Sequence, residues 1–528
     1  MAWVPDNTLQ KTFSFMQGAD NPGIVTNLPT TQVAWSTGLN VRQRVGCVYK
    51  SPGRSAPLAT VTNGLQIRAM FTFKGGDNVW RTLVCCDTKI YSYTNNFGTV
   101  VNITPATPPS STATDVWQFA MIGGMPVLSN GVNTMWKWDL TGNPMTVVSG
   151  APQICKALHV HQNKLIVGNI QEGAYSFTAR LRWANTMQPN GGWTTDLRGL
   201  SGGKDLVPHS TTMQGTDAIQ AITSQGDKLI VLCERNIWYG TPAEWPLDYN
   251  WAAMDSNLGL IAPRAFVKTP KGLIYFMGQD DFHVIADGVQ DIGFGIRNSV
   301  FPVLNKSSIK TAFAYYKPST REVYFCVATG SNTIPDMVFI YNEETKGWMF
   351  ESCCYLSHAF QFDSTNYTWD SADTLPWTYW DDPAVSNRWE NLGDTGVLPY
   401  EVVGTAAGQI QKADTGFNNS DGTAMEGYIE TGDFVLDNTG INKIIHEIVP
   451  ILKPQDTVNA LMIQVGTREN LHKDIEWSTP QVFTIGVSRH VNFRKMGKYF
   501  RIRFITDLTD SPWALEGFAC KYSFGGSR

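Results

Sequence analysis

Apolar residues along this chain alternate with polar ones or gather in short runs, and Gly, Asn and Asp interrupt the runs. Helical periodicity is almost absent. One plan recurs: a first strand of three or four apolar residues, a polar turn, and a second strand that usually carries an aromatic residue. The segments that follow this plan are 81–94, 125–138, 159–170, 226–240, 271–285 and 321–342. The pattern predicts an all-β fold built from hairpins.

The spacing of these hairpins predicts a β-propeller. The anchors Leu83, Val127, Leu165, Leu229, Leu273 and Val323 are separated by 44, 38, 64, 44 and 50 residues. Four of the five gaps are close to the ~40–50 residues of a four-stranded blade. The longest gap predicts an insertion near 171–210. Stacking the blades around an axis buries both faces of each sheet and leaves only short edges. A tandem array of β-sandwiches is the alternative.

Composition changes suggest the domain boundaries. We expect an N-terminal closing or docking segment at 1–60, propeller blades over 61–363, and an aromatic-rich loop or arm at 364–395. Residues 396–528 contain alternating strands that either form a separate antiparallel β-sandwich-like domain or complete the propeller. The aromatic side chains of 364–394 either offer a partner surface or pack the loop onto the blades.

Composition and charge narrow the function. Aromatic residues make up 12% of the 528 residues and charged residues only 16%, which favours β structure. With 41 basic and 46 acidic residues the net charge is −5, which argues against a nonspecific grip on nucleic acid. It does not exclude DNA that passes without being held. The start MAWVPDNTLQ has neither a basic region nor an apolar run, so we expect no signal peptide, and no apolar run approaches the ~18–20 residues of a membrane span.

The nine cysteines show no C-x-x-C spacing. Cys85, Cys86, Cys233 and Cys326 lie inside apolar runs. We therefore predict buried free thiols, made in a reducing compartment, over disulfides or a zinc site.

Two pairs of residues are candidates for chemistry. His159 and His161 are two positions apart and share one face of a strand, but no third metal ligand is visible nearby, so we interpret them as a surface or packed pair. Asp280 and Asp281 fall in a predicted hairpin turn, where Asp bonds to the backbone. We interpret them as turn residues and not as catalytic carboxylates.

Basic residues cluster late in the chain, at 488–503. Arg501 and Arg503 share a strand face with Tyr499. We favour a solvated rim over a contact with an acidic partner or phosphate.

Catalytic motifs are missing from the sequence. The segment 418–425 has only a fragment of the turn repeated in sialidase propellers, and P-loop, G-x-S-x-G, H-E-x-x-H and Rossmann patterns do not occur. We expect no catalytic, cofactor-binding or metal-binding residues and no enzymatic activity.

The segment 34–53 contains Trp35, Asn40, Val41, Arg42, Gly46 and Pro52-Gly53. This set of residues resembles the N-terminal signature of the tail hub or nozzle proteins of short-tailed bacteriophages, a group that includes the packaged-DNA stabilisation proteins. The middle of the chain also resembles this group, at Arg182, Trp183, Ala184 and Trp193, in the predicted hairpin at 226–240, and in the predicted blade segment at 259–288. The ending 496–528 resembles the common ending of the group. The resemblance covers about 23–528, with no counterpart for 364–394.

This resemblance implies a virion component without catalysis. Six copies would form a ring below the portal and adaptor, beside tail fibre, tailspike or needle proteins, and the ring would retain packaged double-stranded DNA and conduct its ejection. The protein would be made in the host bacterial cytoplasm. We expect a polar or mildly acidic lumen, and a strand from 34–53 that fastens the start of the chain into the propeller and ends at Pro52-Gly53. The alternatives are a carbohydrate-binding or carbohydrate-cleaving tail adhesin and, less favoured, an intracellular scaffold propeller.

Overall fold

The structure is a computed structural model, and it describes most of the chain. The described residues are 9–15, 32–33, 35–44, 47–94, 97–112, 114–142, 144–184, 193, 203–206, 217–244, 248–353, 355–361, 400–436, 441–453 and 459–525. They separate into two compact units: residues 1–56, 215–355 and 414–528 form the first unit, and residues 57–214 and 356–413 form the second. No helix among these residues is long and apolar enough to cross a bilayer.

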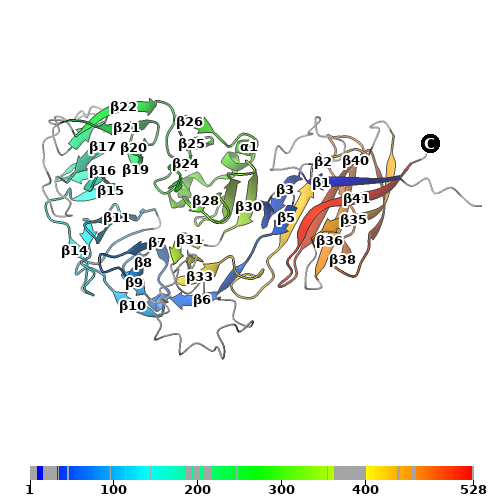
Figure 1. The fold of residues 1–528 in the computed structure, drawn as a ribbon, viewed down its shortest axis with the longest axis horizontal. Helices are drawn as coiled ribbons and strands as arrows, with labels where there is room; N and C mark the ends of the chain where they lie inside the picture. The colour runs from blue at the N-terminus through cyan, green and yellow to red at the C-terminus, as the bar shows by residue number, and fades with distance from the viewer. Residues whose placement is uncertain are drawn as a thin grey trace, which may run out of the picture. The chain divides into compact units, whose positions relative to one another are not determined.

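The described residues contain seven four-stranded antiparallel sheets, which are the blades of a β-propeller (Figure 1). Each blade pairs its strands in an antiparallel order. In the second unit the blades are β7 (Ile67–Lys74), β8 (Trp80–Cys86), β9 (Ile90–Thr94), β10 (Thr99–Asn102); β11 (Gln118–Ile122), β12 (Met125–Ser129), β13 (Trp136–Lys137), β14 (Thr146–Val147); and β15 (Ile154–His161), β16 (Lys164–Glu172), β17 (Tyr175–Trp183), β18 (Gly203–Asp205).

Three further blades belong to the first unit. They are β19 (Ile219–Gln225), β20 (Lys228–Cys233), β21 (Ile237–Pro242), β22 (Tyr249–Asp255); β23 (Phe266–Lys268), β24 (Ile274–Met277), β25 (Phe282–Ile285), β26 (Val289–Asp291); and β27 (Phe313–Lys317), β28 (Glu322–Val327), β29 (Met337–Asn342), β30 (Trp348–Ser352). Short helical turns occur at η1 (Thr62–Gly64), α1 (Arg297–Val300), η2 (Phe301–Val303) and η3 (Lys306–Thr311).

The remaining blade is built from strands that lie far apart in the sequence. It consists of β31 (Tyr355–Gln361), β32 (Tyr400–Thr405), β33 (Gln409–Ala413) and β6 (Arg54–Thr60), in that order. The Val61 amide also donates to the Gly408 carbonyl at 2.8 Å. Residues 400–413 therefore belong to a propeller blade, and the C-terminal strands of the β-sandwich begin after them.

The hairpin repeat in the sequence coincides with the blades. Five anchors lie on the second strand of successive blades, and Leu273 directly precedes the sixth such strand, β24. The five on strands are fully buried, because a second strand has neighbours on both sides and sheets packed on both faces. Residues 164–183, at the start of the expected insertion, form β16 and β17 of a regular blade, and residues 185–192 and 194–202 lie outside the described residues.

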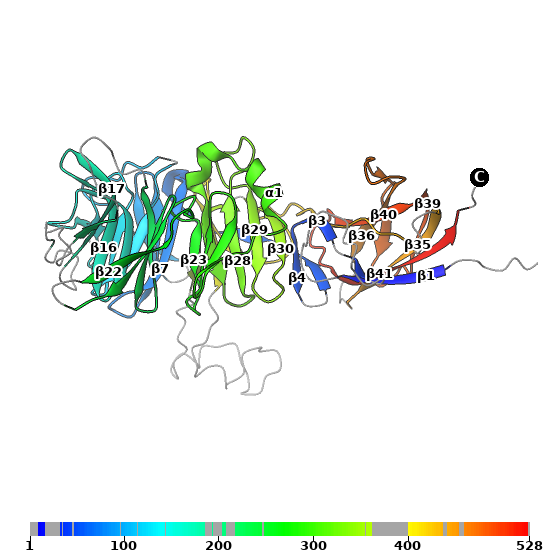
Figure 2. The same cartoon turned by 90° about the horizontal axis from the view of Figure 1, so that it is seen from above.

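The C-terminal domain is a β-sandwich of two antiparallel layers (Figure 2). One sheet contains β2 (Gln32–Val33), β1 (Leu9–Phe15), β41 (Ala514–Phe524), β35 (Lys443–Leu452) and β39 (Val491–Gly497), with β5 (Cys47–Lys50) on β41 and β4 (Val41–Arg44) on β5. The other contains β3 (Trp35–Leu39), β34 (Gly427–Thr431), β40 (Tyr499–Thr506), β36 (Ala460–Arg468), β37 (Glu476–Trp477) and β38 (Gln481–Thr484).

The sandwich core explains the alternating pattern of its strands. Along β40, the residues Phe500, Ile502 and Phe504 are buried and their neighbours are half-buried. The ring of Phe518, from the facing sheet, lies 5.8 Å from that of Phe504 and 5.8 Å from that of Phe434. The fold is therefore all-β, a β-propeller with an added antiparallel β-sandwich, as the sequence predicts.

Candidate functional site

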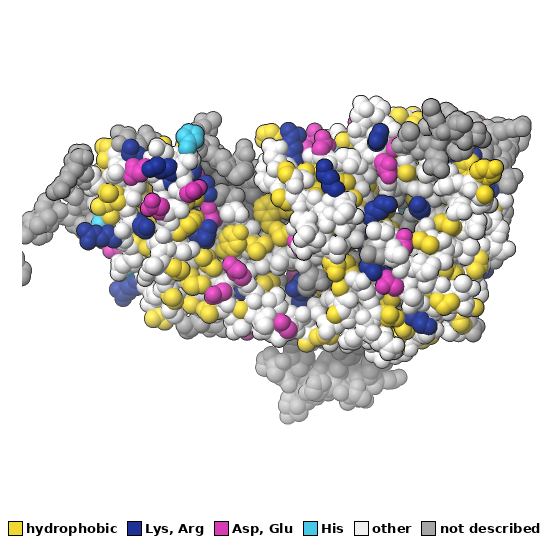
Figure 3. Space-filling view, turned by 180° about the vertical axis from the view of Figure 1, so that it is seen from behind, with side chains coloured by type: hydrophobic (Ala, Val, Ile, Leu, Met, Phe, Trp, Pro, Cys, Tyr) yellow, Lys and Arg dark blue, Asp and Glu magenta, His cyan; other side chains and the backbone are white. Residues whose placement is uncertain are grey.

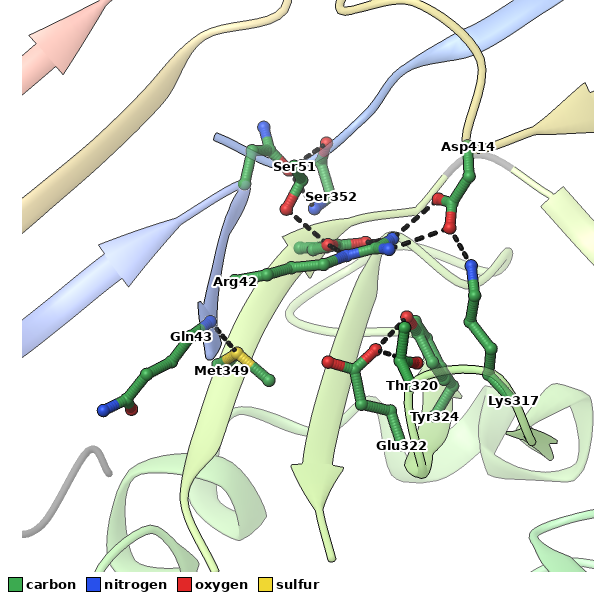
Figure 4. Close-up of polar contacts among 12 residues, drawn as sticks. Arg42, Gln43, Ser51, Lys317, Thr320, Glu322, Tyr324, Met349, Ser352 and Asp414 are labelled. Carbon is green, nitrogen blue, oxygen red and sulfur yellow. Dashed lines mark hydrogen bonds and ion pairs between the residues drawn. The ribbon is translucent and has the colours of Figure 1, made fainter. Parts of the chain in front are cut away.

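The most elaborate polar site among the described residues lies where the N-terminal strands meet the blade β27–β30. It draws on β4 and β5 from the N-terminus, on β27, β28 and β30 of the blade, and on Asp414, which follows β33. All these residues belong to the first unit. We call this cluster of Arg42, Ser51, Lys317, Glu322, Tyr324, Glu351 and Asp414 the ionic joint (Figure 4).

Arg42 is the centre of the ionic joint. Its Nε donates to Glu351 Oε1 at 2.6 Å, and its two terminal nitrogens donate to the Asp414 carboxylate at 2.9 and 2.8 Å. The planar guanidinium thus holds two carboxylates in forked geometry, which a lysine does not reproduce. The Arg42 residue is 4% exposed, so these bonds replace the water that a free guanidinium would bind.

The partners of Arg42 are themselves held in place. The Ser51 hydroxyl donates to Glu351 Oε1 at 2.5 Å, and the Lys317 ammonium pairs with Asp414. The guanidinium carbon of Arg42 lies 5.6 Å from the ring centre of Tyr324. The Tyr324 hydroxyl donates to a Glu322 carboxylate oxygen at 2.9 Å. The buried charges are therefore bound to one another and not to solvent.

Electrostatics keep Arg42 and Tyr324 in their bonded forms. Burial lowers the pKa of Arg42, but the negative charges of Glu351 and Glu322 raise it more, and the pKa ends well above its ordinary value. Burial raises the pKa of Tyr324 well above its ordinary value, so its hydroxyl remains a donor. The ionic joint therefore holds β4 against the blade β27–β30, and its charged groups bind one another.

Asn40 makes a second set of bonds beside the ionic joint. Its backbone adopts a positive φ of 53°, which Asn tolerates better than most residues. Its amide nitrogen donates to the Phe350 carbonyl at 2.9 Å, and its side-chain oxygen accepts from the Ser352 amide at 2.8 Å. Its side-chain nitrogen donates to the Glu426 carbonyl at 2.7 Å. One residue therefore bonds the blade strand β30 and the chain before β34.

Gly53 brings the chain against a second backbone. Its amide donates to the Gly416 carbonyl at 2.8 Å, and the Arg54 amide donates to the Asn418 carbonyl at 3.0 Å. A Cβ at position 53 would overlap the backbone of Asn418. Only glycine allows this close approach, which explains the Pro52-Gly53 pair between β5 and β6.

The prediction that a strand from 34–53 fastens the start of the chain into the propeller is wrong in the sheet that it assigns to the strand. β3 pairs with β34 and β5 pairs with β41, so these strands join the sandwich sheets. The segment contacts the blade β27–β30 through Asn40 and the ionic joint. The strand that enters a propeller blade is β6, directly after the segment, because Gly53 turns the chain toward residues 415–418.

The solvated-rim interpretation of Arg501 and Arg503 is also wrong. Arg501 donates to Glu430 at 2.9 Å and to Asp433 at 2.8 Å, and Arg503 donates to Glu430 at 2.8 Å. The guanidinium of Arg503 also lies 4.1 Å from the ring centre of Trp477. The acidic partners are on β34 and the residues just after it, next to β40 in the sheet.

The two aspartates in the turn are confirmed as turn residues. Asp281 is buried, and its side chain accepts from the Phe282 amide at 2.7 Å and pairs with Arg297 at 3.2 Å. Asp280 is exposed in the same β24–β25 turn. His159 and His161 lie on β15, where His161 is buried and His159 half-buried. Within the described ranges, no group of three or more His, Cys, Asp or Glu is placed to hold a metal ion.

The free, buried state of the thiols is confirmed for the eight cysteines that the structure describes. Burial raises the pKa of Cys86 and of Cys155 to about 12. The segments 364–394 and 1–8 lie outside the described residues.

The sequence analysis did not single out the partners of Arg42. Glu351 lies in the apolar run WMFES and Glu322 begins the apolar run EVYFCV. A carboxylate inside an apolar strand signals a buried partner, since unpaired charges are rarely buried. That signal does not identify the partner.

Comparisons with known proteins add little. No protein-family model matches the chain, and no curated protein sequence matches it. Among solved structures, the Neurospora crassa Pan2 WD40 domain matches at 8% identity and a TM-score of 0.38, covering 70% of this chain and 96% of that one. A fungal alcohol oxidase of the AA5 family, in complex with copper, matches at 10% identity and a TM-score of 0.42, covering 89% and 99%.

A third match is the extracellular domain of a putative one component system from B. thetaiotaomicron, with 8% identity and a TM-score of 0.40. This chain spans 62% of that structure, and 39% of another matched structure, the extracellular domain of a putative hybrid two component system from B. thetaiotaomicron. Likenesses this distant carry no argument about chemistry or function.

Proposed function

We propose that this protein is a structural component of a short-tailed bacteriophage virion. Several copies, six by analogy with the group it resembles, form the ring-shaped tail nozzle or hub below the portal and adaptor. The ring retains the packaged DNA by constriction and conducts it on ejection, without catalysis.

The observation that carries this proposal is the position of the residues that resemble the phage group. Asn40, Arg42 and Gly53 make the contacts that join the N-terminal strands to β30 and to residues 414–418. These matching residues hold strands together and do not form a substrate site. Such a role suits a structural protein.

The middle of the chain supports the same interpretation. Arg182 and Trp183 are buried on β17, where Arg182 pairs with Glu172, and Ala184 bridges to Trp193. These matching residues also hold the blade together.

The edges of the sandwich offer a surface for contacts between copies. β38 and β39 lie at the edges of the two sheets in the described part of the chain. Val482 on β38, Met496 on β39 and Val487 between these strands are exposed, and so are Ile441 and Phe524 at the ends of the interior strands β35 and β41. Burying such side chains and covering open edges favours association with closed symmetry.

The charge suits a conduit. The net charge is −5, and the face in Figure 3 shows basic and acidic side chains interspersed. A continuous basic lining would hold phosphates by releasing their counterions and would slow ejection. We propose polar or mildly acidic side chains toward the lumen.

Light scattering and negative-stain microscopy of the purified full chain test the ring, and incubation with isolated portal–adaptor particles tests docking. We expect rings that bind those particles. The variant Val482→Asp/Met496→Asp is expected to be monomeric with unchanged thermal stability. Val147→Asp, at an exposed apolar residue of β14, is the matched control and is expected to form rings.

Two results would overturn the proposal. One is a monomer that ignores the particles and binds host polysaccharide, which would favour the adhesin. The other is a ring in which microscopy shows a continuous Lys and Arg lining.

A further inference from the structure

A cleft of ≈ 1170 Å³ lies in the first unit, where the chain departs from the all-β pattern. The connection between β26 and β27 contains α1, η2 and η3, which form the longest helical insert among the described residues. This insert forms one wall of the cleft. The β20–β21 and β24–β25 turns contribute the other wall.

The cleft has an apolar floor. Phe301, Leu304 and Ile309 from the insert line it together with Ile261. Leu304 is part of the hydrophobic core of the unit, and the other three pack against that core while remaining partly exposed. The floor is therefore firmly supported and still accessible.

Two more apolar side chains of the β26–β27 connection are exposed. Phe294, three residues before Arg297, is 79% exposed, and Val303 is 48% exposed. The Phe301 ring lies 5.4 Å from the buried ring of Phe282, which anchors the segment between them. A preformed cleft with accessible apolar side chains in its lining is typical of an interaction site.

The rim of the cleft is basic. Four cations line it: Arg235, Arg297, Lys306 and Lys310. Arg297 pairs with Asp281 at 3.2 Å. The side chains of the other three are exposed and make no ion pair within the described parts of the chain.

The acidic side chains of the cleft are fewer. Glu234 and Asp280 line it, and Glu234 accepts a hydrogen bond from Gln220 at 2.7 Å. Beside the Arg297–Asp281 pair, three cations thus face two carboxylates in a chain whose net charge is −5. The cleft is a local basic site on an acidic protein.

We propose that this cleft docks an acidic peptide segment of a partner protein. One large apolar side chain of the peptide rests on Phe301 and Ile309, and flanking carboxylates bind Arg235, Lys306 and Lys310. Charge complementarity selects the peptide, and the apolar floor anchors it. This inference does not depend on the proposed function.

The same features disfavour the other anionic ligands. A small phosphate compound needs donors that converge on one point, whereas these cations are exposed and spread around an open rim. A nucleic-acid backbone offers a row of phosphates but no apolar side chain to cover Phe301 and Ile309, whereas an acidic peptide supplies both an apolar side chain and negative charges.

The test is a peptide array on the full-length protein. It presents 12-residue peptides with a central Trp, Phe or Leu flanked by Asp and Glu, beside counterparts in which Lys replaces every acid. We expect binding to acidic peptides only. Fluorescence polarisation with the strongest peptide is expected to weaken by about tenfold or more in Lys306→Glu/Lys310→Glu, and similarly in Ile309→Asp.

The matched control is Lys271→Glu/Lys473→Glu, which changes the same charge at exposed lysines away from the cleft. It is expected to bind like the unaltered protein. Equal binding of the Lys-containing peptides, equal loss in the control, or no acidic peptide bound would overturn the proposal. So would binding of a DNA duplex that the cleft variant loses, because this would identify a nucleic-acid site.

Discussion

Arg42 on β4 and Glu351 on β30 form a buried ion pair, with 2.6 Å between Nε and Oε1, although 309 residues separate them in the chain. The pair joins a strand of the sandwich sheet to an outer blade strand. Asp414, 372 residues from Arg42, completes the contact. The contact between β4 and β30 thus depends on a few residues, so single substitutions can test it.

Replacing Arg42 by Met is expected to lower the free energy of unfolding by about 3 kcal/mol, because the buried Glu351 would lose its cationic partner, whereas the half-buried Asp414 would keep Lys317. Arg42→Lys is expected to lower the free energy of unfolding by a smaller amount, because lysine keeps the positive charge but cannot make the forked hydrogen bonds. Denaturant titration followed by Trp fluorescence measures the change. Arg321→Met is the control, since its pair with Glu344 is half-exposed, and a loss below about 1 kcal/mol is expected there. Equal effects of the two Met variants would contradict the prediction.

Gly53→Ala is expected to destabilise the protein by about 1–3 kcal/mol, because the new Cβ overlaps the Asn418 backbone, which cannot rotate away as a side chain would. Differential scanning calorimetry checks this. Gly288→Ala is the matched control, because a Cβ at that position meets nothing within 4 Å. An unchanged melting temperature for Gly53→Ala would show that the close approach is absent.

Glu430→Ala is expected to lower the free energy of unfolding by about 3 kcal/mol, because Arg501 and Arg503 each lose a partner that is only 6% exposed. Chemical denaturation measures it. Glu516→Ala, at an exposed position of β41, is expected to have an effect within about 0.5 kcal/mol. If both variants unfold alike, the arginines form a solvated rim after all.

The thiols are expected to resist modification in the folded protein. Eight described cysteines are buried, and burial raises the pKa of Cys86 and Cys155 to about 12, so little thiolate exists near neutral pH. A colorimetric thiol reagent is expected to react with at most one of the nine cysteines in native protein and with all nine in denaturant. Rapid native reaction of several thiols would refute the burial.

Stability is expected to fall as the pH rises from about 9 to 12. Burial raises the pKa of Cys86 and Cys155 from 9.0 to about 12, and that of Tyr93 and Tyr341 from 10.0 to about 12. These groups ionise in the unfolded chain first, so the stability they contribute is complete below the unfolded pKa and is lost as pH approaches the folded pKa. Melting temperatures at stepped alkaline pH check the sign, and a rise over this window would contradict it.

The propeller blades were predictable because their signal is local. The pattern of buried and exposed positions in each hairpin is visible in the residues of that hairpin alone. Anchors such as Leu83 and Val127 could therefore be placed on second strands without knowledge of the rest of the chain. The burial of the cysteines followed for the same reason. The turn role of Asp281 also followed, because a turn aspartate bonds to the backbone next to it.

The partners of the charged residues were decided by tertiary structure. Nothing near Arg42 in sequence identifies Glu351 or Asp414, and nothing near Arg503 identifies Glu430. Strand patterns say which side chains are buried, but the sheet that a strand joins depends on contacts formed hundreds of residues apart. The sequence alone therefore determined the all-β fold and its repeat, whereas the closure of the last blade, the sandwich pairing of 35–50 and the ionic joint arose only when the distant strands came together.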